Sequence, residues 1–181
     1  QSGSKLFSKK FLIIIGVLVF ALIIVAIIAV MSGGNRVKDA SGEALGQRML
    51  NLQELVKYAD SNGVTDAQTM RTNAETNLIL LSSISSLTKV YGESDKAGFS
   101  KPSTEIAAQY TNTETVAELD SAKANSNLNT AYSTALKEQL TDTSSMVQKL
   151  YDNSKSDDVR TALAATYSDL QELISRLPVK N

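Results

Sequence analysis

The chain has 181 residues, with 18 Lys and Arg against 19 Asp and Glu, and it contains no His, Cys or Trp. The lack of Cys and His excludes thiol nucleophiles, imidazole bases, disulfides and the usual ligand sets of zinc, haem and iron–sulfur sites. The composition is uneven, because one uninterrupted apolar run lies near the N-terminus and the rest of the chain is markedly polar.

The first ten residues combine a cloning remnant with a basic tail. Residues 1–4, Gln-Ser-Gly-Ser, resemble what a tag-removing protease and a Gly-Ser spacer leave behind, so we expect the natural chain to begin near Lys5. Lys5, Lys9 and Lys10 then precede the apolar run. We interpret residues 1–10 as this remnant and a short basic tail in the cytoplasm.

Residues 11–31 form the apolar run. At about 1.5 Å of rise per residue, a helix of this length spans about 30 Å, which is the thickness of the hydrocarbon core of a bilayer. A cleaved signal peptide has a shorter apolar region of about 7–15 residues, so the run predicts an uncleaved transmembrane anchor with the lipid bilayer as its partner. The predicted anchor side chains are Phe11, Leu12, Ile13, Ile14, Ile15, Val17, Leu18, Val19, Phe20, Leu22, Ile23, Ile24, Val25, Ile27, Ile28, Val30 and Met31.

The charges on either side of this run predict its orientation. Three lysines precede the run, whereas only Arg36 and Lys38 follow it closely, and the side richer in Lys and Arg usually stays in the cytoplasm. The run contains no ionisable residue of the kind that marks proton or ion paths in membranes. We therefore expect a single-pass protein of the cell membrane, with its N-terminus in the cytoplasm and its bulk outside.

A helical domain is expected at residues 41–178, after a linker at 32–40 that is rich in Gly and Ser. Its apolar residues recur at steps of three and four, as in helices that pack against one another, and no segment alternates as a half-buried strand does. The predicted buried seams are Leu45, Met49, Leu52, Val56 and Ala59; Met70, Ala74, Leu78, Leu81, Ile84, Leu87 and Tyr91; Leu128, Tyr132, Leu136, Leu140, Val147 and Leu150; and Val159, Leu163, Thr166, Leu170, Leu173 and Leu177. The expected fold is all-α, with a single N-terminal transmembrane helix followed by an antiparallel bundle of about four helices.

The helix boundaries carry recognisable signals. We expect helices near residues 41–62, 66–92, 103–153 and 156–177. Gly63 can end the first helix in the left-handed conformation, Thr65 or Asp66 can cap the second, and Ser156 can cap the last. An unbroken third helix would be about twice as long as its neighbours. It either projects beyond the bundle or breaks, with residues 125–127, Asn-Ser-Asn, as the most favourable position.

Tyrosines supply nearly all the aromatic side chains of the predicted bundle. They are Tyr58, Tyr91, Tyr110, Tyr132, Tyr151 and Tyr167. A tyrosine with a buried ring and a wet hydroxyl is ordinary at the rim of a core, and it is also favoured at protein interfaces and ligand pockets. Both interpretations stay open, so these residues are candidate interaction residues. Asn77, Thr88, Gln139 and Thr143 lie close to apolar positions, where they either fix helix register or line a polar cavity.

Two patterns that could carry chemistry have simpler explanations. Asp60, Asn62 and Asp66 lie in one loop, but the spacing does not fit an EF-hand, and a turn with helix caps explains them. Ser86 and Lys89 form a Ser-x-x-Lys pattern that a chain this rich in Ser contains by chance, with no strand–turn–helix context. We therefore predict no metal site, no cofactor and no enzymatic activity.

Charge and layout bear on the partners. After residue 31 the chain carries 15 Lys and Arg against 19 Asp and Glu, which argues against nucleic acid as a partner. No motif is specific to one family. The layout of basic tail, single span and outer bundle is similar to that of LemA-type proteins and of chemoreceptor sensory modules, although chemoreceptors have a second span with no counterpart here.

Three functions fit these features. The first is a non-enzymatic, membrane-anchored bundle that acts through protein contacts, as a structural or accessory subunit of a cell-surface or membrane assembly, with an unidentified protein or a second copy as partner. The second is a ligand-binding or sensory helical domain displayed at the membrane. The third is a pilin-like filament subunit with an apolar core helix, although this run follows lysines and lacks an acidic residue.

Overall fold

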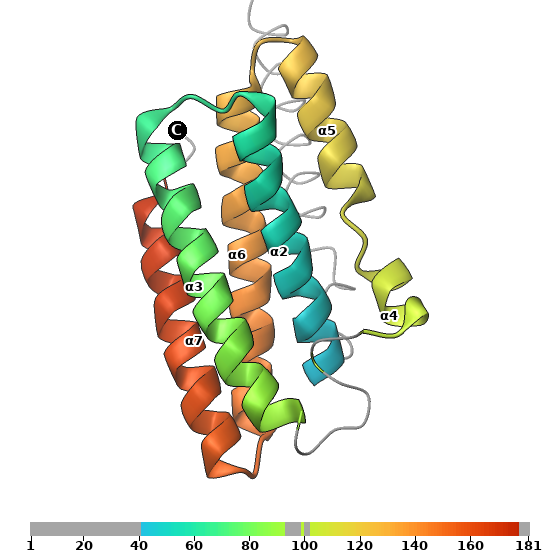
Figure 1. The fold of residues 1–181 in the computed structure, drawn as a ribbon, viewed down its shortest axis with the longest axis vertical. Coiled ribbons are helices and arrows are strands. Elements are labelled where there is room, and N and C mark those ends of the chain that lie inside the picture. Colours follow the sequence, from blue (N-terminus) through green and yellow to red (C-terminus); the bar gives the residue numbers. More distant parts are fainter. Residues whose placement is uncertain (1–40, 93–98, 100–101, 178–181) are drawn as a thin grey trace, which may run out of the picture. The chain divides into compact units, whose positions relative to one another are not determined.

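The computed structural model describes residues 41–92, 99 and 102–177, which belong to one compact unit, Asp39–Asn181 (Figure 1). These residues are all-helical, as the sequence predicts. The helices are α2 (Gly42–Asn62), α3 (Ala67–Gly92), α4 (Thr104–Gln109), α5 (Thr113–Ala124), α6 (Leu128–Asn153) and α7 (Asp157–Arg176). None of these described helices is long and apolar enough to cross a bilayer. The predicted tail, anchor and linker, at 1–40, lie outside the described residues.

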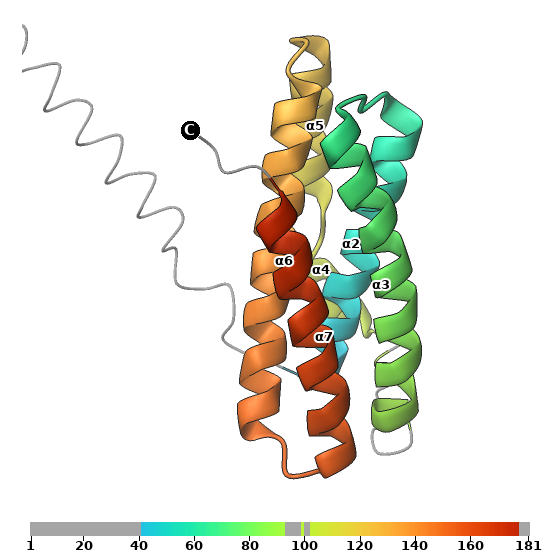
Figure 2. The same ribbon diagram turned by 90° about the vertical axis from the view of Figure 1, so that its left-hand side faces the viewer.

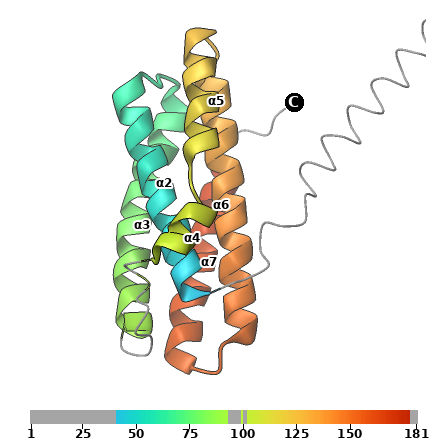
Figure 3. The ribbon, with the colours of Figure 1, turned by 90° about the vertical axis from the view of Figure 1, so that its right-hand side faces the viewer.

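The four long helices pack as a bundle. Helix α2 lies against α3 and α6, and α7 lies against the same two helices, so α2 and α7 occupy opposite corners. Neighbouring helices run antiparallel, and α6 and α7 form a hairpin at one end (Figures 1 and 2). Helices α4 and α5 lie outside this bundle, where α4 contacts α2 and α5 contacts α6 (Figure 3).

The predicted helix caps of α3 and α7 are confirmed. Asp66 Oδ2 accepts the backbone N–H of Thr69 at 3.1 Å, and this hydrogen bond, together with one from the Thr69 hydroxyl, lowers the pKa of the Asp66 carboxyl. Ser156 Oγ accepts the backbone N–H of Val159 at 3.4 Å. Gly63 ends α2 with φ 82°, in the left-handed region that glycine enters without strain. These bonds satisfy backbone groups that a helix end leaves open.

The segment 103–153 is broken, so the alternative of one continuous helix is wrong. It interrupts after α4 and again at residues 125–127, where the sequence favours a break. Ser126 adopts φ 56°, and the N–H of Asn127 reaches back to the carbonyl of Ala122 at 2.8 Å. This closing pattern lets α5 fold back along α6 instead of projecting beyond the bundle.

Three of the four predicted seams form the core. The seam residues of α2 and α7 are buried, as are those of α6 except the half-buried Leu150. Of the polar residues expected near the seams, Thr143 is buried and donates to the carbonyl of Gln139, whereas Asn77 is exposed. The core therefore follows the apolar periodicity on α2, α6 and α7.

Helix α3 departs from this pattern, and its predicted seam is wrong. Only Leu87 of that seam is buried, whereas Ala74, Leu78 and Leu81 are exposed. The residues that α3 buries are Thr69, Thr72, Asn73, Thr76, Leu80, Ser83 and Leu87. The helix thus turns a largely polar face to the core and an apolar stripe outward.

Local hydrogen bonds explain how α3 buries threonines. The hydroxyl of Thr72 donates to the carbonyl of Gln68 at 3.1 Å, and that of Thr76 donates to the carbonyl of Thr72 at 2.7 Å. A hydroxyl satisfied by its own helix leaves the side-chain methyl to pack in the core, so the desolvation cost of burial is largely avoided. In this setting a threonine packs much as a valine does.

Asn73 joins three helices through a buried network. Its side-chain N–H₂ donates to Asp60 Oδ1 at 3.1 Å and to the carbonyl of Val56 at 3.3 Å, both on α2. Its side-chain oxygen accepts the hydroxyl of Tyr132, a fully buried residue of α6. A satisfied buried network of this kind specifies one orientation of α3 against its neighbours.

The chain also approaches α2 closely at Phe99. A Cβ placed on Gly46 would lie 1.9 Å from the carbonyl oxygen of Phe99, so only glycine fits at this point of the helix. The Phe99 ring is 2% exposed and stacks on Tyr91, with ring centroids 5.9 Å apart. These contacts hold Phe99, which lies between α3 and α4 in the sequence, against the bundle.

Candidate interaction surface on helix α3

The outward face of α3 carries a stripe of apolar and small residues. Ala74, Leu78, Leu81 and Ser85 recur at steps of four, three and four, so they line one side of the helix, and we call them the outer stripe. Leu78 is 67% exposed and Leu81 is 54% exposed. Among the described residues, these two are the exposed large hydrophobic side chains.

A shallow groove runs beside the outer stripe, between α3 and α7. Its volume is about 230 Å³. The lining residues are Glu75, Leu78, Ile79, Glu172, Leu173 and Arg176. Leu78 belongs to both features, so the stripe and the groove form one continuous surface with an apolar floor and charged residues at one end.

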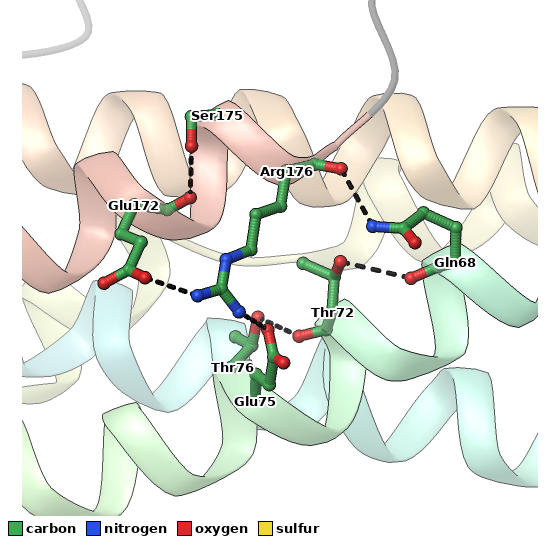
Figure 4. A network of polar contacts seen from close by, with 7 residues as sticks. All are labelled: Gln68, Thr72, Glu75, Thr76, Glu172, Ser175 and Arg176. Atoms are coloured by element: carbon green, nitrogen blue, oxygen red, sulfur yellow. Dashed lines mark hydrogen bonds and ion pairs between the residues drawn. The ribbon is translucent and has the colours of Figure 1, made fainter.

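Arg176 organises the charged end of the groove (Figure 4). Its guanidinium makes ion pairs with Glu75 of α3 and Glu172 of α7. Gln68 of α3 donates its side-chain N–H to the backbone carbonyl of Arg176 at 3.3 Å. The hydrogen bonds that Arg176 donates to Glu75 and then to Glu172 raise the pKa of Arg176 further, so this bridge between the two helices stays charged.

The ionisable side chains that line the groove are two carboxylates and one guanidinium. Its two carboxylates share one guanidinium, and exposed pairs of this type contribute little to stability. Within the described ranges, no three His, Cys, Asp or Glu side chains are placed to hold a metal ion. An apolar floor with a charged end can seat an apolar side chain and orient a polar one beside it.

None of the candidate tyrosines lines the groove, and they are spread over α2, α3, α6, α7 and the end of α4. The Tyr132 hydroxyl is used inside the core, as described above. Tyr58 of α2 donates its hydroxyl to Asp120 of α5 at 2.7 Å, which ties the outer helix to the bundle. Partial burial raises the pKa of Tyr58 to about 12, and the hydrogen bond to Asp120 acts in the same direction.

The remaining tyrosines also have neighbours within the domain. Arg48 lies over the Tyr110 ring at 5.1 Å, and Arg160 lies over the Tyr151 ring at 4.6 Å. Tyr91 stacks on Phe99, as described above, and Tyr167 is half-buried on α7. The structure therefore distributes the six tyrosines over the bundle and does not gather them into one site.

The exposure of the outer stripe is not predicted from the sequence, which places Ala74, Leu78 and Leu81 in a buried seam. Apolar residues usually face inward, so the apolar spacing on α3 predicts that these residues lie in the core. The missed signal is the second series on the opposite face, Thr69, Thr72, Asn73 and Thr76, whose members can hydrogen-bond locally.

Comparisons of the chain with protein-family models, curated proteins and solved structures found no match.

Proposed function

We propose that this chain is a non-enzymatic, single-pass membrane protein whose helical bundle binds another protein through α3. It serves as a structural or accessory subunit of a cell-surface or membrane assembly. The anchor part of the proposal is supported by the apolar run at residues 11–31. The binding part is carried by one observation, the exposure of Leu78 and Leu81 side by side on the outer stripe.

The exposure of these two leucines has a clear energetic meaning. Complete burial of a leucine side chain contributes about 1.5–3 kcal/mol, and α3 forgoes this gain while it buries threonines instead. Single exposed apolar residues are normal on protein surfaces, whereas adjoining ones with a polar rim mark interaction sites. Here Glu75 and Arg176 supply part of that rim.

The shape of the groove favours a protein over a small ligand. Pockets that bind drug-sized molecules enclose about 300–1,000 Å³ and bury most of the ligand. The groove between α3 and α7 measures about 230 Å³ and lies open on the surface. It fits one or two side chains of a partner helix, with Leu78 contributing to the contact.

The test is capture of partners from the native membrane by the full tagged chain after mild cross-linking. The double variant Leu78→Gln, Leu81→Gln keeps α3 helical and removes the apolar surface, so it should lose at least about tenfold of the captured partner, since each leucine contributes more than about 1 kcal/mol. A matched control is Ala164→Gln, which alters an exposed position of α7.

The outcomes separate the proposal from its rivals. A stoichiometric protein that wild type and Ala164→Gln capture, and that the double variant loses, supports the proposal. Equal capture by all three chains overturns it. Retention of a small molecule by all three chains would favour the ligand-binding function, and assembly into fibres would favour the filament function.

A further inference from the structure

We propose that the partner of the outer stripe is a second copy of this chain, and that the two α3 helices pair antiparallel about a two-fold axis near Ser82. This inference rests on the proposed function, because it names the protein that the α3 surface binds. The two α3 helices pair in a single register. That register follows from the sizes and the charges of the residues along α3.

The sizes of the outer-stripe residues fit this register. The stripe has the 3-4 spacing of a coiled-coil seam, and antiparallel helices with such seams pack side by side. With the axis between Leu81 and Ser82, Leu81 meets Leu81 of the second copy and Leu78 lies opposite Ser85. A large side chain then faces a small one on both sides of the axis, so the leucines fill space that the serines leave.

The charges beside the stripe fit the same register. Glu75 and Lys89 lie on the same edge of α3, two heptads apart, with Ser82 midway between them. In an antiparallel pair this edge meets the same edge of the second copy, so Glu75 of each copy lies beside Lys89 of the other. Lys89 is exposed, and Glu75 keeps 32% of its side chain exposed next to Arg176. Two opposite-charge pairs therefore form by symmetry.

A parallel pair has no such match. In parallel coiled coils this edge faces the opposite edge of the partner helix. On α3 the opposite edge carries Asn77 and Ile84, which have no charge to offer Glu75 or Lys89. A two-fold pair buries the same patch on both copies, so every contact away from the axis occurs twice.

Charge exchange on α3 tests the register. The full chain is studied in detergent micelles, and the dissociation constant of its dimer is measured by sedimentation velocity. Lys89→Glu and Glu75→Lys each turn attraction into repulsion in two symmetric charge pairs. Each pair is worth less than about 1 kcal/mol by itself, but the two reversals together should weaken the dimer about tenfold. A mixture of the two variants places opposite charges together again, and it should form a mixed dimer close to the wild-type affinity.

Controls exclude general effects of charge and of folding. Lys57→Glu makes the same charge change at an exposed position of α2 and should leave dimerisation unchanged. Glu75→Lys also removes an ion pair with Arg176, whereas Lys89→Glu changes no ion pair among the described residues. Equal loss with Lys89→Glu therefore assigns the effect to the paired interface.

The possible results distinguish this inference from the proposed function. Weakening by both single variants and recovery in the mixture support the antiparallel pair. A chain that stays monomeric, or a dimer that Lys89→Glu leaves unchanged, overturns it. If a different protein is then captured in a manner that depends on Leu78 and Leu81, the pairing is wrong while the function stands.

Discussion

At the scale of single residues, Gly46 marks the closest approach in the domain. The predicted change is Gly46→Ala, whose added Cβ meets the Phe99 carbonyl at 1.9 Å and must push that backbone away from α2. Alanine favours the helix by about 1 kcal/mol, but forced overpacking costs about 1–3 kcal/mol, so the net effect is destabilising. We expect the full chain to melt a few degrees lower by circular dichroism.

Gly42→Ala is the matched control for this prediction. There the nearest atom is Cδ1 of the Tyr91 ring, at 2.8 Å, and a side chain can rotate away where a backbone cannot. The control should lose less stability than Gly46→Ala. If Gly46→Ala melts at or above the wild-type temperature, Phe99 does not lie against α2.

Tyr58 predicts how stability changes at high pH. Its pKa is about 12 in the folded domain, because partial burial and the hydrogen bond to Asp120 favour the protonated phenol, whereas an unfolded tyrosine has a pKa near 10.0. A group whose pKa is raised on folding contributes stability that is fully present below the unfolded value and is lost as the pH rises through the folded one. The contribution of Tyr58 should therefore fall away between about pH 10 and pH 12.

The measurement compares the melting temperatures of wild type and Tyr58→Phe across this pH range. Phenylalanine cannot ionise, so the variant starts less stable at pH 9 for lack of the hydrogen bond and loses less as the pH rises. The two melting curves should converge toward pH 12. If the melting temperatures of the two chains depend on pH in the same way, folding does not raise the pKa of Tyr58.

At the scale of secondary structure, the sequence predicts where helices end better than it predicts which face of a helix is buried. Caps and stops are local, so Gly63, Asp66 and Ser156 mark the ends of their helices without reference to the rest of the fold. The facing of α3 depends on partners distant in sequence, such as Tyr132, which holds Asn73 inside the core. An apolar periodicity count treats threonine as polar and could not predict that outcome.

The break between α5 and α6 leads to a prediction at this scale. Ser126 adopts φ 56°, a conformation that costs a non-glycine residue about 1–2 kcal/mol. Ser126→Gly removes this conformational cost from the folded domain. Glycine also raises the conformational entropy of the unfolded chain, which offsets part of the gain, so the variant should stabilise the domain by about 0.5–1 kcal/mol. Chemical denaturation of the full chain measures the change.

Ser121→Gly, in the interior of α5, controls for the general effect of glycine. It should destabilise the domain by about 0.5 kcal/mol relative to the wild-type serine, the opposite direction to Ser126→Gly. Loss of stability in both variants would mean that α5 continues through residue 126 as a longer helix.

At the scale of the whole molecule, the charges around the apolar run predict the topology. The lysines before residue 11 favour a cytoplasmic N-terminus and an outer bundle. Protease added to intact cells should therefore digest the bundle and spare the basic tail. Full protection in sealed cells, followed by digestion after lysis, would place the bundle in the cytoplasm and reverse the prediction.

One claim underlies the proposed interaction surface and its partner: α3 turns its polar face to the core and its apolar stripe outward. The chain has no Cys, so single cysteines can be introduced at neighbouring positions and labelled with a maleimide. The most informative positions are Leu80, which is 0% exposed, and Leu81, which is 54% exposed. Both substitutions are made in the Lys89→Glu background and labelled at a protein concentration well below the dissociation constant of its dimer, so that pairing of copies does not cover the stripe.

The result that most directly tests the orientation of α3 is the ratio of the two labelling rates under native conditions. Leu81→Cys should react at the rate of a freely accessible thiol, and Leu80→Cys should react only when the domain opens, at least about 100-fold more slowly, given a typical domain stability of about 5–15 kcal/mol. Faster labelling at position 80 than at position 81 would contradict this orientation, because it would mean that the apolar stripe faces the core.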